Sequence, residues 1–143
     1  MTKQEYMDIY NVVGAAMEVH SVLGNGMAEA IYQEALAIEM KKKGMHVERE
    51  KELRLHYKDT LLEKTYYADL YYNGVIIELK SVDEIIPTHR SQLFNYMRIT
   101  KTLRGILINF GEESLYSERY LYLPKTNNFV MNNHDNYKNY ITE

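Results

Sequence analysis

The sequence predicts one mixed α/β domain in which helices flank a β-sheet, with the element order ααβββαββ. Three observations predict this fold class. Two amphipathic helical repeats open the chain, and β-prone runs joined by an Asn-Gly pair occupy its middle. A third helical repeat, which ends near residue 100, is followed by two more β-prone runs.

Composition bounds the class of protein. Of the 143 residues, 45% are hydrophobic and 26% are charged, which is typical of a globular domain with one core. The absence of Cys excludes a disulfide framework and thiolate metal sites, and favours a cytoplasmic location. No apolar run approaches membrane-spanning length, so we expect no membrane association. A net charge of -3 argues against a general polyanion binder.

The first two elements are predicted to form a helical hairpin. Apolar residues recur every three or four positions over residues 4–23, beginning with Ile9 and Val12. Glycines at 24 and 26 interrupt this pattern, and a second helical pattern runs from residue 28 to Lys43. Gly44 follows, a residue that commonly ends helices.

The next elements are strands. Residues 46–57 alternate, with Leu53 and Leu55 on one face and Glu48, Glu50 and Glu52 on the other, which is typical of an edge strand. Further strands are expected at 61–72, 75–82, 104–110 and 115–123, with a helix over 88–100. Residues 1–124 are thus expected to form the domain, and the Asn-rich residues 125–143 a poorly ordered tail.

Two acids lie unexpectedly within the hairpin of residues 66–80. If Asn73-Gly74 forms a two-residue type I′ turn, Asp69 lies directly opposite Glu78. Like charges in opposed positions are destabilising, and a bound divalent cation would explain them. Lys80 projects from the same face as Glu78. The alternative is that both side chains point to solvent, but the strand 75–82 is apolar on both faces, so a charged trio there favours a functional site.

Two other patterns are weaker. His89, Gln92 and Tyr96 share one helix face, which is also what a surface helix with one packed Tyr would show. Glu29 stands in a first helical turn, where an acid commonly stabilises the helix dipole.

Taken in order, these segments resemble the GxxExxY proteins, a branch of the PD-(D/E)xK nuclease superfamily, over roughly residues 10–123. Gly26, Glu29 and Tyr32 match the naming motif, and His20 and Gly24 precede it as in the family. The remaining matches are Asp69 for the first acid, Glu78-Leu79-Lys80 for the (D/E)xK element, Gln92 and Tyr96 for the QxxxY helix, and residues 104–111 for the closing strand.

The resemblance implies a restriction-endonuclease-like fold and metal-dependent hydrolysis of phosphodiester bonds. Asp69, Glu78 and the carbonyl of Leu79 would hold Mg²⁺ or Mn²⁺, with Glu29 acting directly or through water. Lys80 would orient the attacking water or stabilise transition-state charge. Gln92 and Tyr96 would complete the catalytic set as positioning residues.

Substrate contacts are expected from Arg90, Arg98, Lys101 and His89 on the later helix, and from Tyr32 on the second helix. Nucleic acid, with DNA favoured, is the expected partner, and a homodimer or a protein partner is compatible with the sequence. The alternative function is a non-catalytic protein-interaction module with a nuclease-like fold and a structural metal site. The tyrosine content and negative charge would suit protein contacts.

Overall fold

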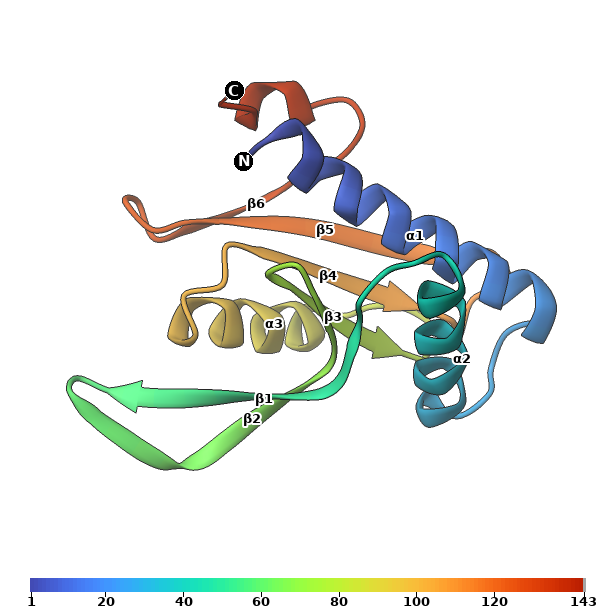
Figure 1. Cartoon of the computed structure of the whole chain (residues 1–143), viewed down its shortest axis with the longest axis horizontal. Coiled ribbons are helices and arrows are strands. Elements are labelled where there is room, and N and C mark those ends of the chain that lie inside the picture. Colours follow the sequence, from blue (N-terminus) through green and yellow to red (C-terminus); the bar gives the residue numbers. More distant parts are fainter. Residues whose placement is uncertain (143) are drawn as a thin grey trace.

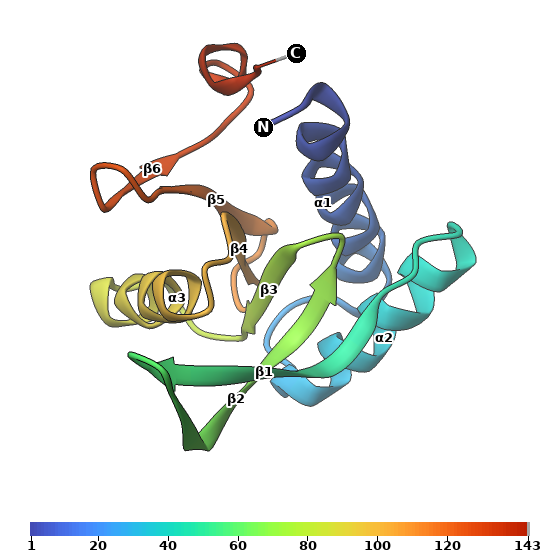
Figure 2. The same ribbon diagram turned by 60° about the vertical axis from the view of Figure 1, so that its left-hand side comes forward.

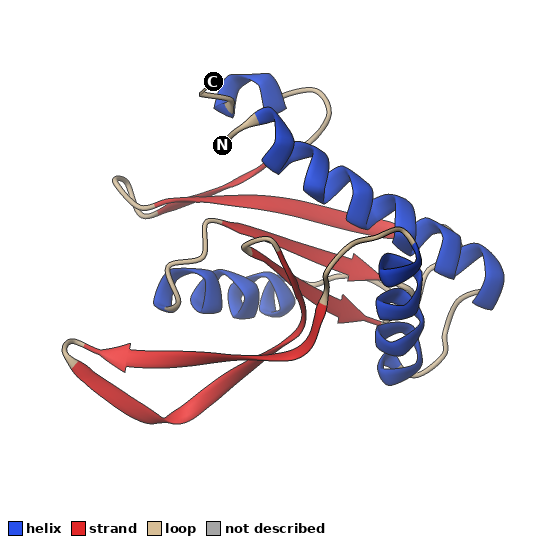
Figure 3. Cartoon of the chain, in the orientation of Figure 1, coloured by secondary structure: helices blue, strands red, loops and turns tan. Residues whose placement is uncertain are grey.

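The computed structural model describes residues 1–142, which form three α-helices, a six-stranded sheet and one short 3₁₀ helix (Figures 1 and 3). The predicted order is confirmed and extended by one strand. The elements are α1 (Lys3–Leu23), α2 (Glu29–Lys42), β1 (Glu48–Tyr57), β2 (Thr60–Tyr72), β3 (Val75–Lys80), α3 (Pro87–Ile99), β4 (Arg104–Asn109), β5 (Tyr116–Leu123), β6 (Asn128–Met131) and the 3₁₀ helix Tyr137–Tyr140.

The sheet is mixed and has helices on both faces. Its strands follow the order β1-β2-β3-β4-β5-β6, and β3 and β4 form the parallel pair, connected through α3. Helices α1 and α2 cover one face and α3 covers the other (Figure 2). Ile77 and Leu79 pack in the α1–α2 core, while Ile76 packs in the α3 core, so β3 is buried from both sides as its apolar sequence predicts.

The predicted hairpin turn between β2 and β3 is confirmed. Asn73 and Gly74 both have positive φ angles, 47° and 80°, as a type I′ turn requires. The turn sets the register, which pairs Tyr72 with Val75 and, two steps on, Leu70 with Ile77. In that register the next two residues across the pair are Asp69 and Glu78.

Strand β2 leaves β3 at Asp69 and continues with β1 as a two-stranded arm. The paired positions of β2 and β3 end at Leu70, whereas β2 pairs with β1 as far as Thr60. Leu70 packs in the α1–α2 core, but Ala68 and Tyr66 pack in the α3 core. The arm therefore swings around the edge of β3, and its far end lies beneath α3 (Figures 1 and 2).

The tail expectation is wrong for residues 125–142, while Glu143 lies outside the described residues. Strand β6 pairs with β5, and Phe129 stacks on Phe94 of α3. The ring of Tyr137 stacks on Tyr6 of α1 at 3.9 Å, and Asn132 is fully buried. The Asn-rich composition led to the wrong prediction. A few aromatic side chains are enough to hold a polar segment against the core, even when the segment has no periodic pattern of its own.

Removing the tail should therefore destabilise the domain. A chain ending at Lys125 loses the stacking of Phe129 and Tyr137 and one sheet edge, so we expect a loss of about 2–4 kcal/mol and a melting temperature lower by roughly 10 °C. Lys138→Ala in the full chain, which changes an exposed side chain, serves as the control. Equal melting temperatures for the full and shortened chains would contradict the docked tail.

Candidate active site

Glu78 and Lys80 lie at the end of β3, on the face covered by α3. Both line a small pocket whose other walls come from α3 and Leu107. Oε1 of Glu78 is buried and has no hydrogen-bond partner within residues 1–142. Burial raises the pKa of Glu78 to about 8, although the backbone N–H of Asp69 and the charge of Lys80 act in the opposite direction. The pocket thus holds a carboxyl group whose ionised form is poorly solvated by the protein alone.

Asp69 lies beside this pocket at the point where β2 leaves β3. Its Oδ2 accepts a hydrogen bond of 2.9 Å from the backbone N–H of Leu79. Burial raises the pKa of Asp69, the Leu79 N–H lowers it, and the charges of Glu29 and Glu50 raise it further. The N–H and carbonyl of one strand residue face the same neighbour, so the Leu79 carbonyl also points toward the Asp69 side of β3.

The loop before α2 brings Glu29 toward these acids. Glu29 is the first residue of α2, and its negative charge raises the pKa of both Asp69 and Glu78. Gly26 has φ +87°, a conformation that favours glycine, and its N–H donates to the carbonyl of Phe110. The Ser81 hydroxyl donates to the carbonyl of Met27. These bonds attach the loop to the ends of β3 and β4, next to the pocket.

Tyr32 is an anchor for this loop and not a substrate contact, so that prediction is wrong. Its side chain is fully buried and stacks on Phe110 at 4.4 Å. The hydroxyl donates to the Gly24 carbonyl at 2.7 Å and accepts from the Met27 N–H at 3.1 Å. The hydroxyl proton is used within the fold and the side chain is fully buried, so Tyr32 is not accessible to a ligand.

The structure brings three predicted residues of α3 to the pocket: His89, Gln92 and Tyr96. Nδ1 of His89 accepts a hydrogen bond from the Ile86 N–H, so Nε2 carries the proton of the neutral ring. Burial and the charge of Lys80 lower the pKa of His89. Tyr96 stacks on Tyr66 of the arm with ring centroids 3.5 Å apart. The shared helix face predicted from the sequence is confirmed.

Arg90 points away from the pocket, which corrects its prediction as a substrate contact. Its guanidinium makes two hydrogen bonds, of 2.7 and 2.8 Å, to the carboxylate of Glu118 on β5. The hydroxyls of Tyr116 and Tyr120 also donate to this buried carboxylate. Burial alone would raise the pKa of Glu118, but the four hydrogen bonds outweigh it and lower the pKa to about 2. Arg90 therefore fixes α3 to the sheet.

The two remaining predicted cations lie apart from the acids. Arg98 is exposed, donates to Asn95 and lies over the ring of Phe129. Lys101 follows the C-terminal end of α3, which is about 20 Å long, whereas the pocket lies at its N-terminal half. The structure does not bring Lys101 to the pocket.

Sequence reasoning missed Glu50 and Gln33. The register places Glu50 opposite Asp69, and the charge of Glu50 raises the pKa of Asp69 and Glu78. The buried Gln33 donates to Glu50 at 2.7 Å and accepts from Arg49. The alternation of residues in this strand predicted that the Glu50 side chain points to solvent. Its backbone has φ +48°, which changes the direction of the side chain. A positive φ at Glu leaves no signal in the sequence.

The fold, the two acids and Lys80 together are typical of one class of protein. A sequence comparison identifies this class. The profile of the PD-(D/E)XK nuclease superfamily matches residues 7–120. The chain belongs to this superfamily and has its restriction-endonuclease-like fold. Members of the superfamily generally use divalent metals such as Mg²⁺. No curated protein sequence matches the chain.

Among the matching solved structures is one described as the crystal structure of SSO0001, with a TM-score of 0.49 and 20% identity. The match covers 63% of this chain and 48% of that protein, so it spans about half the length of SSO0001. Within residues 1–142, no helix is both long and apolar enough to cross a membrane.

Removing Arg90 should destabilise the fold by leaving Glu118 buried and unpaired. We expect Arg90→Ala to cost about 3 kcal/mol in chemical denaturation. The same substitution in a Glu118→Gln background should cost less than about 1 kcal/mol, because no buried charge is then left unpaired. Arg98→Ala, which removes an exposed guanidinium of the same helix, is the control. Equal costs of Arg90→Ala in both backgrounds would refute the coupling.

Glu78 should make the stability of the metal-free protein depend on pH. The pKa of Glu78 rises from 4.5 in the unfolded chain to about 8 in the folded chain. The contribution of Glu78 to the stability of the fold is therefore fully present below about pH 4.5 and is lost as the pH rises through 8. Glu78→Gln cannot ionise. With chelator present, its melting temperature should match that of the wild type near pH 5 and exceed it by several degrees near pH 9. Parallel pH profiles of the two proteins would show that Glu78 ionises as freely in the fold as in water.

Proposed function

We propose that this chain is a nuclease that hydrolyses phosphodiester bonds in nucleic acid, DNA being favoured, with Mg²⁺ or Mn²⁺ as cofactor. The observation that carries the proposal is the unpartnered, buried Oε1 of Glu78 beside the ammonium of Lys80. Within residues 1–142, Lys80 forms no ion pair. A buried carboxylate oxygen without a partner is costly unless a cation binds it. The motif residues Gly26, Glu29 and Tyr32 support assignment to the GxxExxY branch.

The donor atoms fit a hard divalent cation. Asp69 and Glu78 supply carboxylate oxygens, and the Leu79 carbonyl faces the same space. Within residues 1–142, no three His, Asp or Glu side chains gather closely enough to hold an ion by themselves. That donor set suits Mg²⁺, which commonly takes one or two carboxylates and completes its shell with water and substrate phosphate. A bound cation would polarise the phosphoryl group and lower the pKa of an attacking water.

The chain's own groups have distinct roles in this mechanism. The Leu79 N–H fixes one oxygen of Asp69 and leaves the other available to a cation. Lys80 places a positive charge where negative charge develops on the phosphoryl oxygens, and it can hold the attacking water. The protonated Nε2 of neutral His89 can donate a hydrogen bond to a phosphate oxygen. Gln92 and Tyr96 shape the wall against which the scissile group is oriented.

Glu29 belongs to the outer part of this site. It is exposed at the start of α2, and its charge acts on Asp69 and Glu78. A carboxylate in that position can bind a water of the metal shell without contacting the ion. We therefore assign Glu29 a smaller share of the catalytic effect than Asp69.

Cleavage of DNA by the purified chain with Mg²⁺ tests the proposal. Glu78→Gln and Lys80→Ala should each lower the rate at least about 100-fold with the fold retained, because an interaction with the reacting group is removed. Glu29→Gln should lower it less than Asp69→Asn does. Glu113→Gln and Lys125→Ala make the same chemical changes at exposed positions and should leave the rate unchanged.

Three results would contradict the proposal. An unchanged rate in Glu78→Gln would place the chemistry elsewhere. A larger loss in Glu29→Gln than in Asp69→Asn would reverse the assigned roles. A wild-type chain that binds Mg²⁺ but cleaves neither DNA nor a small phosphodiester would favour the non-catalytic interaction module.

A further inference from the structure

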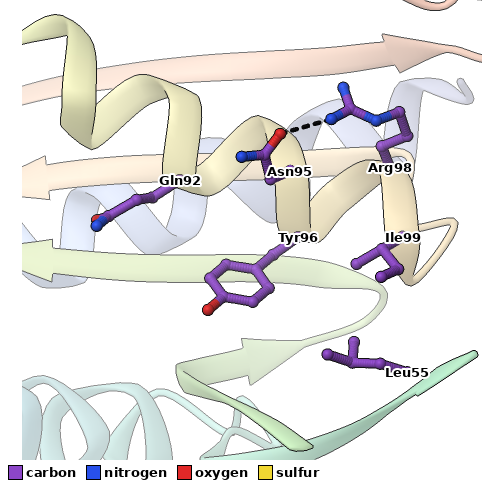
Figure 4. Close-up of a pocket in the computed structure, with 6 residues that line it drawn as sticks. All are labelled: Leu55, Gln92, Asn95, Tyr96, Arg98 and Ile99. Atoms are coloured by element: carbon purple, nitrogen blue, oxygen red, sulfur yellow. Dashed lines mark hydrogen bonds between the residues drawn. The ribbon is translucent and has the colours of Figure 1, made fainter. Parts of the chain in front are cut away.

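A groove separates α3 from the β1–β2 arm. Leu55 lines it from the arm, and Gln92, Asn95, Tyr96, Arg98 and Ile99 line it from α3 (Figure 4). The cavity volume is about 520 Å³. The groove exists because the arm leaves β3 at Asp69 and passes beneath α3, so both of its walls are fixed by the core of the domain.

The groove adjoins the candidate active site. Gln92 and Tyr96 line the groove and also the small pocket that contains Glu78 and Lys80. In Figure 4 the ring of Tyr96 projects from α3 toward the arm, with Gln92 to one side of it and Leu55, on the arm, to the other. A polymer lying in the groove would thus run toward the pocket that contains Glu78 and Lys80.

The lining suits bases better than phosphates. Leu55, Ile99 and the Tyr96 ring form an apolar surface, and Ile99 is 41% exposed. The Asn95 side chain accepts from Arg98 through its oxygen, which leaves its NH₂ group directed to no partner within residues 1–142. The Gln92 amide likewise makes no hydrogen bond within the described chain. Apolar faces with amide groups at the rim match the faces and edges of unstacked bases.

The charges around the groove do not suit a duplex. Arg98 is the cation that lines it, and on the arm Lys51 and Arg54 are paired with Glu48 and Glu52. A duplex turns its bases inward and presents two phosphate backbones, so its binding depends on many unpaired cations.

We propose that this groove binds one unpaired nucleic-acid strand through its bases and delivers it to the Glu78–Lys80 pocket. The inference rests on the proposed nuclease function and adds the substrate class to it: single-stranded ends, flaps or loops are preferred over paired duplex. With Arg98 and Lys80 as the phosphate contacts, the slope of log K against log salt concentration should be shallow, about -1.4.

Fluorescence anisotropy with a short single-stranded oligonucleotide and with the matching blunt duplex, both with chelator, tests the groove. The wild type should bind the single strand at least about tenfold more tightly than the duplex. Ile99→Glu should weaken single-strand binding about tenfold or more, and Asn95→Asp, at an exposed position, should also weaken it and serves as a second test should Ile99→Glu impair folding. Val22→Glu, the same charge change at an exposed apolar residue of α1, should bind as the wild type does.

Hydrolysis of bis(p-nitrophenyl) phosphate, which is too small to need the groove, separates this inference from the proposed function. Ile99→Glu should hydrolyse it at the wild-type rate while losing activity on the oligonucleotide. Failure of the wild type on this compound and on DNA counts against the nuclease, not against the groove. Tighter binding of duplex, a steep salt slope, or wild-type binding by both groove variants would overturn the inference. So would an Ile99→Glu effect on self-association alone, which would make the groove a contact between copies of the chain.

Discussion

At Asp69, strand β2 stops pairing with β3. The backbone N–H of Leu79, which would bond to β2 if the ladder continued, donates its hydrogen bond to the Asp69 carboxylate. The rest of the site depends on this hydrogen bond. It satisfies a backbone donor that would otherwise be left unpaired, so the two strands can separate without a large cost. Separation exposes the end of β3 between the arm and α3. The same event therefore opens the pocket that holds Glu78 and creates the groove beside it.

The site brings four acidic side chains near one another, and two of them, Asp69 and Glu78, are half-buried. Burial raises the pKa of both Asp69 and Glu78, and the charges of Glu29 and Glu50 add to the effect. Glu50 also occupies a left-handed backbone conformation, which for a residue other than glycine costs of order 1–3 kcal/mol. A fold selected for stability alone would avoid both features. Such features often cluster at functional sites, which agrees with the proposed cation site at Asp69 and Glu78.

Several polar residues near the site serve the scaffold. Tyr32 uses its hydroxyl to close the loop from Gly24 to Met27, and Glu29 follows directly on that loop. Arg90 and Glu118 attach α3 to β5, which fixes the helix that carries His89, Gln92 and Tyr96. The Gly26, Glu29 and Tyr32 motif can thus be read physically: a glycine for the turn, an acid presented to the pocket, and an aromatic anchor that holds the turn in place.

The sequence by itself determined the elements whose cause is local. Helical periodicity located α1, α2 and α3, and the Asn73-Gly74 turn set the register that brings Asp69 next to Glu78. Side chains on one strand or helix face, such as Glu78 with Lys80 and Gln92 with Tyr96, were predictable because their spacing alone places them together.

Only the tertiary structure decided where separate elements meet. Arg90 meets Glu118 across 28 residues, and Tyr137 meets Tyr6 across most of the chain, so no local pattern signals either contact. Glu50 reaches the site through a backbone conformation that its residue type disfavours, and such a conformation is imposed by the surrounding packing and not by the residue itself.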